Sequence, residues 1–284
     1  AEKILARRDQ VRIVIIAGPS SSGKTTTTIK IEETLKTQGF ELVAMNLDNY
    51  FFDLSHHPRD EFGDYDFETP EALDLKLINQ HLADLLKGKT IQMPIYNFKT
   101  GKRETSTVPM KLQPNQIVLL DSLHGLYGPM TDSVPLEKKF KIYIETLCQI
   151  KNDDGQFLRW TDIRILRRML RDSWHRSYNP RQTLEHWHYV RRSEIKNIIP
   201  FLDTVDHLID GSLPFELPIY KRHIFHHFPD FIRDYKDDVK RQDAYIRAKR
   251  VHDMLAPFHT WEDETIVPND SLIREYIGGS IYKY

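Results

Sequence analysis

The sequence predicts an α/β protein with a mostly parallel β-sheet and helices on both of its faces. Two observations predict this three-layer fold. Short apolar runs rich in Val and Ile recur along the chain, and stretches with helical spacing of apolar residues separate them. The 284 residues can hold one large domain, or one domain with a sizeable appendage. Because ligands of such folds bind beyond the carboxyl ends of the strands, residues that follow a strand are the first candidates for a site.

Strands and helices alternate in the first half of the chain. We expect strands over residues 11–17 and 40–47, which are mostly apolar. Residues 24–38 predict a helix that Gly39 ends, and residues 70–86 predict another, with apolar side chains at a helical period. Residues 91–107 are polar and rich in turn residues, with a small hairpin around residues 100–102.

The second half continues this alternation and then changes character. Three further strands are predicted over residues 117–120, 141–145 and 205–209, and Arg-rich helices over 161–175 and 181–192 lie between the last two. After about residue 213 the chain is helical and strongly charged over 219–256, and a final helix over 271–277 ends before Gly278. We find no internal repeat.

A glycine-containing motif follows the first strand. Residues 18–25 read Gly-Pro-Ser-Ser-Ser-Gly-Lys-Thr, the pattern G-x-x-x-x-G-K-[ST], between a predicted strand and a predicted helix. The glycines let backbone N–H groups surround a phosphate oxygen, and the helix directs the positive end of its dipole at it. We name the predicted nucleotide-binding residues the phosphate loop: Gly18, Pro19, Ser20, Ser21, Ser22, Gly23, Lys24, Thr25 and Thr26. The alternative interpretation is a flexible Ser-rich turn.

The motif predicts binding of a nucleoside triphosphate. Lys24 would reach the β- and γ-phosphates, and the Thr25 hydroxyl would be a ligand of Mg²⁺. Asp121 follows the apolar run 117–120. A carboxylate at the end of a strand is typical of a second Mg²⁺-orienting residue beside the Thr25 hydroxyl. Many strands end in Asp, so this pattern gains its meaning from the phosphate loop.

An acid beside aromatic residues follows the second predicted strand. Asp48 precedes Tyr50, Phe51 and Phe52. A carboxylate within reach of an acceptor hydroxyl can take its proton during attack on a γ-phosphate, and the aromatic rings would form the wall of an acceptor pocket. The alternative is an acidic turn over an ordinary core.

Arginine dominates the helical stretch after residue 153. No lysine stands between residues 159 and 192, whereas this range contains nine arginines: Arg159, Arg164, Arg167, Arg168, Arg171, Arg176, Arg181, Arg191 and Arg192. Arg164, Arg168 and Arg171 share one helical face. Guanidinium groups bind phosphate oxygens in pairs, so this stretch predicts a lid over the transferred phosphoryl group. The alternatives are a solvated basic face and a surface that binds RNA.

Composition excludes several classes of function. The formal net charge of −1 and the pI near 7.0 argue against a general nucleic-acid or membrane surface. No run approaches the about 18 apolar residues that a membrane span needs. The single cysteine, Cys148, excludes an internal disulfide and indicates a cytoplasmic protein. The pairs His56-His57 and His226-His227 lack the cysteine partners of a typical metal site.

These residues resemble the uridine kinase and phosphoribulokinase group of P-loop kinases, and most closely the bacterial nucleoside kinase domain that follows threonyl-tRNA-synthetase-like segments. The resemblance covers nearly the whole chain. Its blocks are residues 16–26, 47–51, 64–68, 96–103, 162–168, 187–192 and 271–279. It implies a kinase domain over residues 1–212, with a lid at about 153–192, and a helical C-terminal extension over 213–284 packed on that domain. It also implies fusion to an N-terminal synthetase-like region.

The resemblance implies roles for individual residues. Asp48 corresponds to the catalytic base, Asp66 to the carboxylate that holds the ribose hydroxyls, and Tyr96 to a pocket aromatic, with Arg103 as a nearby basic residue. Arg168, Arg171 and Arg176 correspond to lid and substrate-site arginines. The implied reaction is phosphoryl transfer from ATP or GTP, with Mg²⁺, to the 5′-hydroxyl of a nucleoside such as uridine or cytidine.

Three places depart from that group. Gly101 stands where typical uridine-cytidine kinases have a base-reading histidine, and Asp121-Ser122 replaces the usual Glu-Gly at the strand end. Residues 157–160, Phe-Leu-Arg-Trp, replace a more polar run before the lid. Two alternatives therefore stay open beside the nucleoside kinase. One is a kinase for another small hydroxyl compound, such as pantothenate, glycerate or a sugar phosphate. The other is a non-catalytic module that regulates a fused partner. The oligomeric state also stays open.

Overall fold

The computed structural model describes residues 1–59, 65, 69–175 and 179–283. It contains a five-stranded sheet and a two-stranded hairpin among these residues. The contacts of the chain divide it into two compact units. Unit 1 consists of Ala1–Pro19, Thr28–Tyr143 and Arg192–Leu208, and unit 2 of Ser20–Thr27, Ile144–Arg191 and Ile209–Tyr284.

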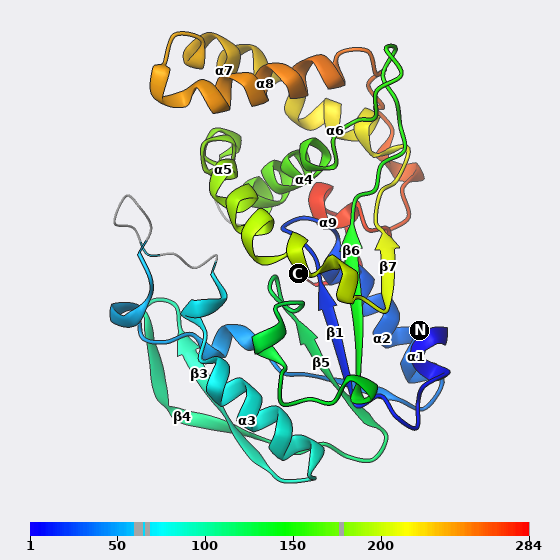
Figure 1. Cartoon of the computed structure of the whole chain (residues 1–284). Coiled ribbons are helices and arrows are strands. Elements are labelled where there is room, and N and C mark those ends of the chain that lie inside the picture. Colours follow the sequence, from blue (N-terminus) through cyan, green and yellow to red (C-terminus); the bar gives the residue numbers. More distant parts are fainter. Residues whose placement is uncertain (60–64, 66–68, 176–178, 284) are drawn as a thin grey trace. The chain divides into compact units, whose positions relative to one another are not determined.

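The sheet has the strand order β2-β5-β1-β6-β7 (Figure 1). Its strands are β1 (Ile13–Ala17), β2 (Glu41–Ala44), β5 (Gln116–Asp121), β6 (Lys139–Glu145) and β7 (His207–Asp210). The pairs β1–β5, β1–β6 and β2–β5 are parallel. Every residue of β1 is buried, so both faces of the sheet are covered at its centre, as a parallel sheet requires.

Helix α3 (Leu75–Leu86) of unit 1 shows why its sequence is helical. Asp74 caps its first turn by accepting a hydrogen bond from the Leu77 N–H at 3.0 Å. Its buried residues Ile78, Leu82 and Leu85 are spaced four and three apart, and they share a hydrophobic core with β1 and β5. Unit 1 also contains the short helix α1 (Glu2–Leu5) and most of α2 (Lys24–Thr37).

An antiparallel hairpin completes unit 1. Strands β3 (Ile91–Asn97) and β4 (Lys102–Met110) pair along their length, with a bulge between Pro94 and Tyr96. Gly101 forms the turn in the left-handed region, at φ +66°. The hairpin predicted around residues 100–102 is therefore much longer than the sequence indicated, because β4 is mostly exposed and its polar composition resembles a loop.

Unit 2 is helical. Its elements are α4 (Trp160–His175), the larger part of α5 (Pro180–Asn197), α6 (Glu216–Ile224), α7 (Phe228–Tyr235), α8 (Gln242–Leu255) and α9 (Arg274–Ile277). One hydrophobic core joins α4 to the later helices. Helices α7 and α8 pack side by side (Figure 1), and α4 contacts both α6 and α9.

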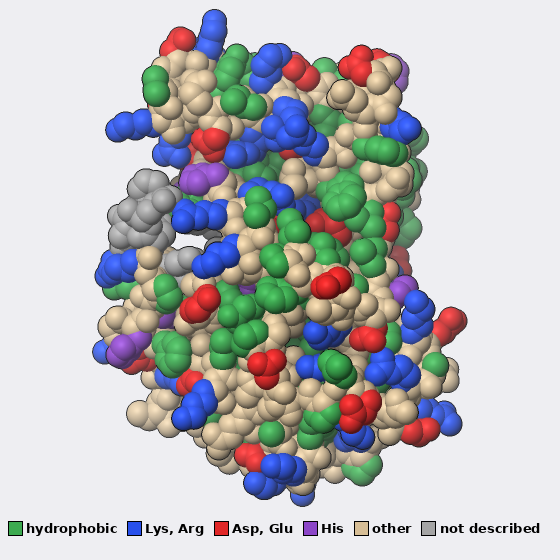
Figure 2. All heavy atoms as spheres, in the orientation of Figure 1, with side chains coloured by type: hydrophobic (Ala, Val, Ile, Leu, Met, Phe, Trp, Pro, Cys, Tyr) green, Lys and Arg blue, Asp and Glu red, His purple; other side chains and the backbone are tan. Residues whose placement is uncertain are grey.

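The α/β fold with a mostly parallel sheet is confirmed. The helical character predicted over 219–256 is confirmed; three separate helices occupy the range, and Pro229 stands in the first turn of α7. The predicted boundary at residue 212 stays a prediction. Basic and acidic side chains both lie on the face drawn in Figure 2, and the net charge of the chain is near zero. None of the helices in the described part of the chain is long and apolar enough to cross a membrane.

Candidate functional site

Residues 20–26 of the phosphate loop lie in unit 2, where two of them have left-handed backbone conformations. Ser21 has φ +61° and Gly23 has φ +94°. A Cβ atom on Gly23 would lie 2.4 Å from the Cδ1 atom of Leu272, so a larger residue would have to displace the Leu272 side chain as well as adopt a left-handed conformation. Left-handed geometry costs a serine about 1–2 kcal/mol, and such a residue persists only where its surroundings hold it.

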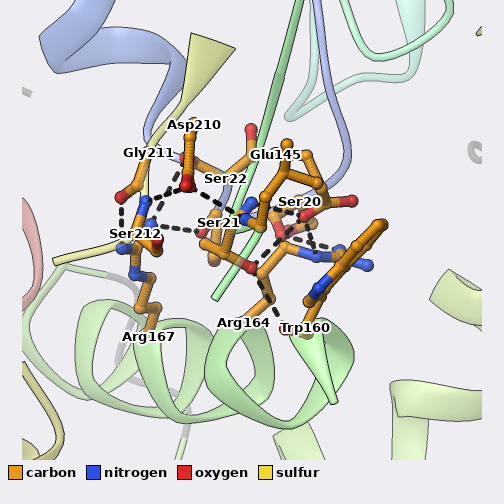
Figure 3. Close-up of polar contacts among 12 residues, drawn as sticks. Ser20, Ser21, Ser22, Glu145, Trp160, Arg164, Arg167, Asp210, Gly211 and Ser212 are labelled. Atoms are coloured by element: carbon orange, nitrogen blue, oxygen red, sulfur yellow. Dashed lines mark hydrogen bonds and ion pairs between the residues drawn. The ribbon is translucent and has the colours of Figure 1, made fainter. Parts of the chain in front are cut away.

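The surroundings hold the loop by its carbonyl groups (Figure 3). Arg164 Nη1 donates to the Ser20 carbonyl at 3.2 Å, and Arg167 Nη1 donates to the Ser22 carbonyl at 3.3 Å. The Tyr276 hydroxyl donates to the Ser21 carbonyl, also at 3.3 Å. Three successive carbonyls are thus turned toward donors from α4 and α9.

The N–H groups of the loop face the other way. The structure contains no cis peptide among the described residues, so the N–H after each carbonyl points opposite to it. The N–H groups of Ser20, Ser21, Ser22 and Gly23 donate to no other residue that the structure describes. The Oγ atoms of Ser21 and Ser22 are buried and likewise have no hydrogen-bond partner there. Consecutive N–H groups with unused donors, at the start of the 14-residue helix α2, form a nest suited to phosphate oxygens.

Two arginines of α4 belong to the framework of the loop. Arg164 forms an ion pair with Glu145, with its Nε 2.9 Å from Oε1, and Arg167 pairs with Glu216 at 2.7 Å. All four side chains are buried. Burial disfavours a charged guanidinium, yet the charge of Glu216 outweighs it and raises the pKa of Arg167 well above its ordinary value. The helical spacing predicted that Arg164 shares an exposed, phosphate-binding face with Arg168 and Arg171. The structure instead buries Arg164 in the ion pair with Glu145.

Arg168 and Arg171 keep part of their surface accessible. Their side chains are 18% and 16% exposed, and both approach the Ser20 hydroxyl, with Arg168 Nη1 at 3.1 Å and Arg171 Nη2 at 3.5 Å. Asp172 forms ion pairs with both. The buried Nε of Arg171 has no hydrogen-bond partner among the described residues. These two guanidinium groups lie at the loop with part of their surface accessible to an anion, and their contact with a phosphoryl group stays a prediction.

The first turn of α2 carries the remaining predicted nucleotide ligands. Lys24 is partly exposed and Thr25 is exposed, whereas Thr26 is fully buried and donates to Glu275 Oε2 at 3.0 Å. Gly18 and Pro19 are buried and belong to unit 1. The sequence predicted Thr26 as a nucleotide ligand, but its hydroxyl is used by the C-terminal segment.

Asp48 lies in unit 1, in the 3-10 turn Leu47–Tyr50 that follows β2. Its side chain is exposed, and its N–H donates to the Asn46 side chain at 2.9 Å, which caps the turn. The buried neighbours Leu47 and Tyr50 anchor the turn from below. This arrangement presents the carboxylate to solvent on a fixed support, where it can accept a proton.

Aromatic rings gather beside this turn within unit 1. The Phe51 ring centroid lies 5.6 Å from that of Tyr96, 5.3 Å from that of His57 and 6.0 Å from that of Phe98. Phe51 and Tyr96 are buried, and Phe98 is largely exposed. The Asn49 side chain accepts a hydrogen bond from the Tyr96 N–H at 3.1 Å, so the turn and the hairpin are tied together. This aromatic cluster can serve as the wall of a pocket.

Arg103 supports the same segment. Its guanidinium donates to the carbonyls of Phe51 at 2.8 Å and Tyr50 at 2.7 Å, and forms an ion pair with Asp74 at 3.1 Å. The residue thus holds the backbone after Asp48 in place. Contact of Arg103 with a substrate stays a prediction.

The predicted Mg²⁺ ligands are hard oxygen donors, as this ion requires. Thr25 belongs to unit 2 and Asp121, exposed at the end of β5, to unit 1. Among the residues that the structure describes, no cluster of three or more His, Cys, Asp or Glu side chains could hold a metal by itself. Mg²⁺ that is shared with phosphates needs only one or two protein ligands, and each of these side chains is by itself an oxygen donor of the kind that the ion takes; a shared Mg²⁺ site stays a prediction. Asp66 and Arg176 lie outside the described residues.

Sequence reasoning missed the residues behind the phosphate loop. These are Glu145, Glu216, Glu275 and Tyr276, and also Arg167, whose burial and ion pair with Glu216 were not predicted. Their partners are far away in the chain, so no local spacing could reveal them. One signal was present: residues 271–279 belonged to the blocks of the resemblance, although the sequence assigned them no role.

Most of the chain matches a known protein family. The model of the "Phosphoribulokinase / Uridine kinase family" matches residues 13–214. The uridine kinase of Deinococcus deserti is 29% identical over 191 residues, which are 66% of this chain and 82% of that protein. The uridine kinase of Borrelia turicatae is 34% identical over 162 residues, which are 57% of this chain and 68% of that protein.

Two solved structures resemble parts of the chain. A putative fructose transport system kinase from Silicibacter sp. TM1040 has a TM-score of 0.45 at 13% identity and covers 73% of this chain and 96% of its own. A possible uridine kinase from Bacillus stearothermophilus has a TM-score of 0.44 at 16% identity and covers 73% of this chain and 100% of its own. The family match spans well over half of the residues, includes the phosphate loop, and implies the use of a nucleoside triphosphate. The chain therefore belongs to the phosphoribulokinase and uridine kinase family of P-loop kinases.

Proposed function

We propose that the protein transfers the γ-phosphoryl group of ATP or GTP to the 5′-hydroxyl of a nucleoside, with uridine and cytidine as the first acceptors to test. One observation carries the proposal: a nest of unused N–H groups, with its carbonyls held from behind and Arg168 and Arg171 beside it, in a chain of this kinase family. Its relatives named uridine kinase, at about 30% identity, support the nucleoside acceptor.

In the proposed reaction, the loop N–H groups and Lys24 bind the phosphates of the donor. Arg168 and Arg171 bind oxygens of the γ-phosphoryl group, where planar guanidinium groups stabilise the charge that is transferred. Asp48 accepts the proton of the acceptor hydroxyl, while Phe51 and Tyr96 flank the acceptor. Asp66, Arg103 and Arg176 complete the proposed set of substrate ligands. Mg²⁺, held by Thr25 and Asp121, would neutralise charge on the phosphate oxygens.

A kinase for another hydroxyl compound is the second candidate, and position 101 favours it. A Cβ atom on Gly101 would lie 2.9 Å from the Leu54 Cβ, and its φ is +66°. The position therefore has no room for a side chain like the base-reading histidine that the resemblance leads us to expect. Recognition of a base, if the acceptor is a nucleoside, must come from other residues.

The acceptor is tested by incubating the protein with γ-labelled ATP, Mg²⁺ and a panel of nucleosides, pantothenate, glycerate and sugar phosphates. The proposal expects label on uridine or cytidine. Label on a compound that is not a nucleoside would support the second candidate. ATP binding without label on any acceptor would instead favour a non-catalytic module, such as one that regulates a fused synthetase-like region.

A further inference from the structure

We propose that Glu275 and Tyr276 are positioning residues for the phosphate loop, so that the C-terminal segment controls the affinity for nucleotide phosphates. Both residues lie in α9, beyond residues 13–214 that match the family. The inference rests on the proposed function insofar as the loop must bind a nucleoside triphosphate. It adds a role for a part of the chain that the family match does not cover.

Tyr276 acts on the most constrained peptide of the loop. Its hydroxyl donates to the Ser21 carbonyl at 3.3 Å, and Ser21 is the residue with φ +61°. The other donor to this carbonyl, Arg167 Nη1, is farther away at 3.5 Å. Tyr276 is fully buried, and the Arg167 guanidinium lies 5.2 Å from its ring centroid. The phenol therefore helps to fix the direction of the Ser21–Ser22 peptide, and with it the direction of the Ser22 N–H.

Glu275 acts on the helix that follows the loop. Its Oε2 atom accepts the hydrogen bond from the Thr26 hydroxyl at 3.0 Å, and both residues are buried. Thr26 lies in the same turn of α2 as Lys24 and Thr25, the residues predicted to bind the phosphates and Mg²⁺. Leu272 packs against Gly23 between these two contacts. The segment from Leu272 to Tyr276 thus touches the loop at three points along its length.

Loss of either contact should lower the fraction of molecules whose loop is ready to bind. A ligand that binds only the competent conformation has an apparent Kd equal to its intrinsic Kd divided by that fraction. Removal of one hydrogen bond shifts such an equilibrium by roughly three- to tenfold. Neither Glu275 nor Tyr276 needs to touch the nucleotide for this effect.

The test measures ATP binding by titration calorimetry on the whole chain, in the presence of Mg²⁺ and without an acceptor. Tyr276→Phe removes only the hydroxyl, Glu275→Leu removes the acceptor of the Thr26 hydrogen bond, and Glu275→Gln keeps a carbonyl acceptor. Tyr235→Phe is the matched control, because it also removes a buried tyrosine hydroxyl, one that donates to Glu185 at 2.6 Å away from the loop. Thermal unfolding of each variant measures the loss of stability.

The inference expects ATP affinity to fall roughly three- to tenfold in Tyr276→Phe and Glu275→Leu. Glu275→Gln should regain most of it, and Tyr235→Phe should bind like the wild type despite a similar fall in Tm. Wild-type affinity in both Tyr276→Phe and Glu275→Leu, or an equal loss in Tyr235→Phe, would overturn the inference. Failure of the wild type to bind ATP would refute the proposed function itself, and the inference with it.

Discussion

The ion pair behind the phosphate loop gives a prediction that can be worked out from the structure. Arg167 and Glu216 are buried and 2.7 Å apart, and Arg167 Nη2 also donates to the Gly211 carbonyl at 2.7 Å. Arg167→Leu leaves the Glu216 carboxylate buried without its counter-charge. Breaking a buried pair in this way costs about 3–5 kcal/mol in free energy of unfolding.

The double variant Arg167→Leu/Glu216→Leu separates this explanation from a simple loss of packing. With both charges gone, the desolvation cost of an unpaired charge disappears. What remains is the loss of donors to the carbonyls of Gly211 and Ser22 and of the acceptor of the Leu213 N–H, about 1–3 kcal/mol for each group that is left unsatisfied. The double variant should therefore be more stable than the single variant. Each kcal/mol corresponds to about 2–4 °C in Tm for a chain approaching this size, so Arg167→Leu should lower Tm by about 6–20 °C.

The assay is urea and thermal unfolding followed by circular dichroism. Arg233→Leu is the control, because its ion pairs with Asp230 and Asp234 are exposed and the urea midpoint should stay close to that of the wild type. The reasoning is refuted if Arg167→Leu unfolds at the wild-type midpoint. It is equally refuted if the double variant is no more stable than Arg167→Leu.

Three further predictions concern the loop, its arginines and the core of unit 1. Gly23→Ala should weaken ATP binding and lower stability more than Gly39→Ala, because both glycines have positive φ but only Gly23 lacks room for a Cβ; equal effects in calorimetry and unfolding would contradict this. Arg168→Ala and Arg171→Ala should each raise the Kd of ATP about tenfold or more, because a charged hydrogen bond is lost; unchanged Kd values would remove these residues from the site. Burial lowers the pKa of His81, whose Nδ1 lies 2.8 Å from the Tyr50 hydroxyl. The stability from neutral His81 is therefore complete above its unfolded pKa of about 6.5 and is lost as the pH falls through the folded pKa. The urea concentration at the unfolding midpoint should therefore decrease when the pH is lowered from about 7.5 to about 5.5, and it should decrease less in His81→Gln than in the wild type. Parallel pH profiles of the two proteins would contradict this.

The sequence predicted the structure well where the conformation depends on neighbouring residues alone. The motif at residues 18–25 predicted positive φ at Gly18 and Gly23 and a helix that starts near Lys24. The helix and Gly23 are confirmed, whereas the second left-handed residue of the loop is Ser21 and not Gly18. The strands were located from their β-branched runs. Their ends shifted by a few residues, as at β1, which begins at Ile13 rather than at residue 11.

Spacing failed where the answer depends on distant parts of the chain. Arg164, Arg168 and Arg171 share a helical face, yet Arg164 is buried because Glu145, at the end of β6, forms an ion pair with it. The same holds for Thr26 and Glu275, which are 249 residues apart in sequence. The break between α6 and α7 was not predicted for a different reason. Pro229 is a local signal for the start of a new helix, but the segment was assigned as a whole from its charged, helical composition.

The central claim is that a loop which binds phosphates serves a reaction in which Asp48 takes a proton from an alcohol. The most direct measurement compares Asp48→Asn with the wild type in two assays, ATP binding by calorimetry and acceptor-dependent release of ADP. We expect an unchanged Kd for ATP and a turnover at least ~10²-fold lower in Asp48→Asn, since a general base contributes about that much. Turnover at the wild-type rate in Asp48→Asn would contradict it.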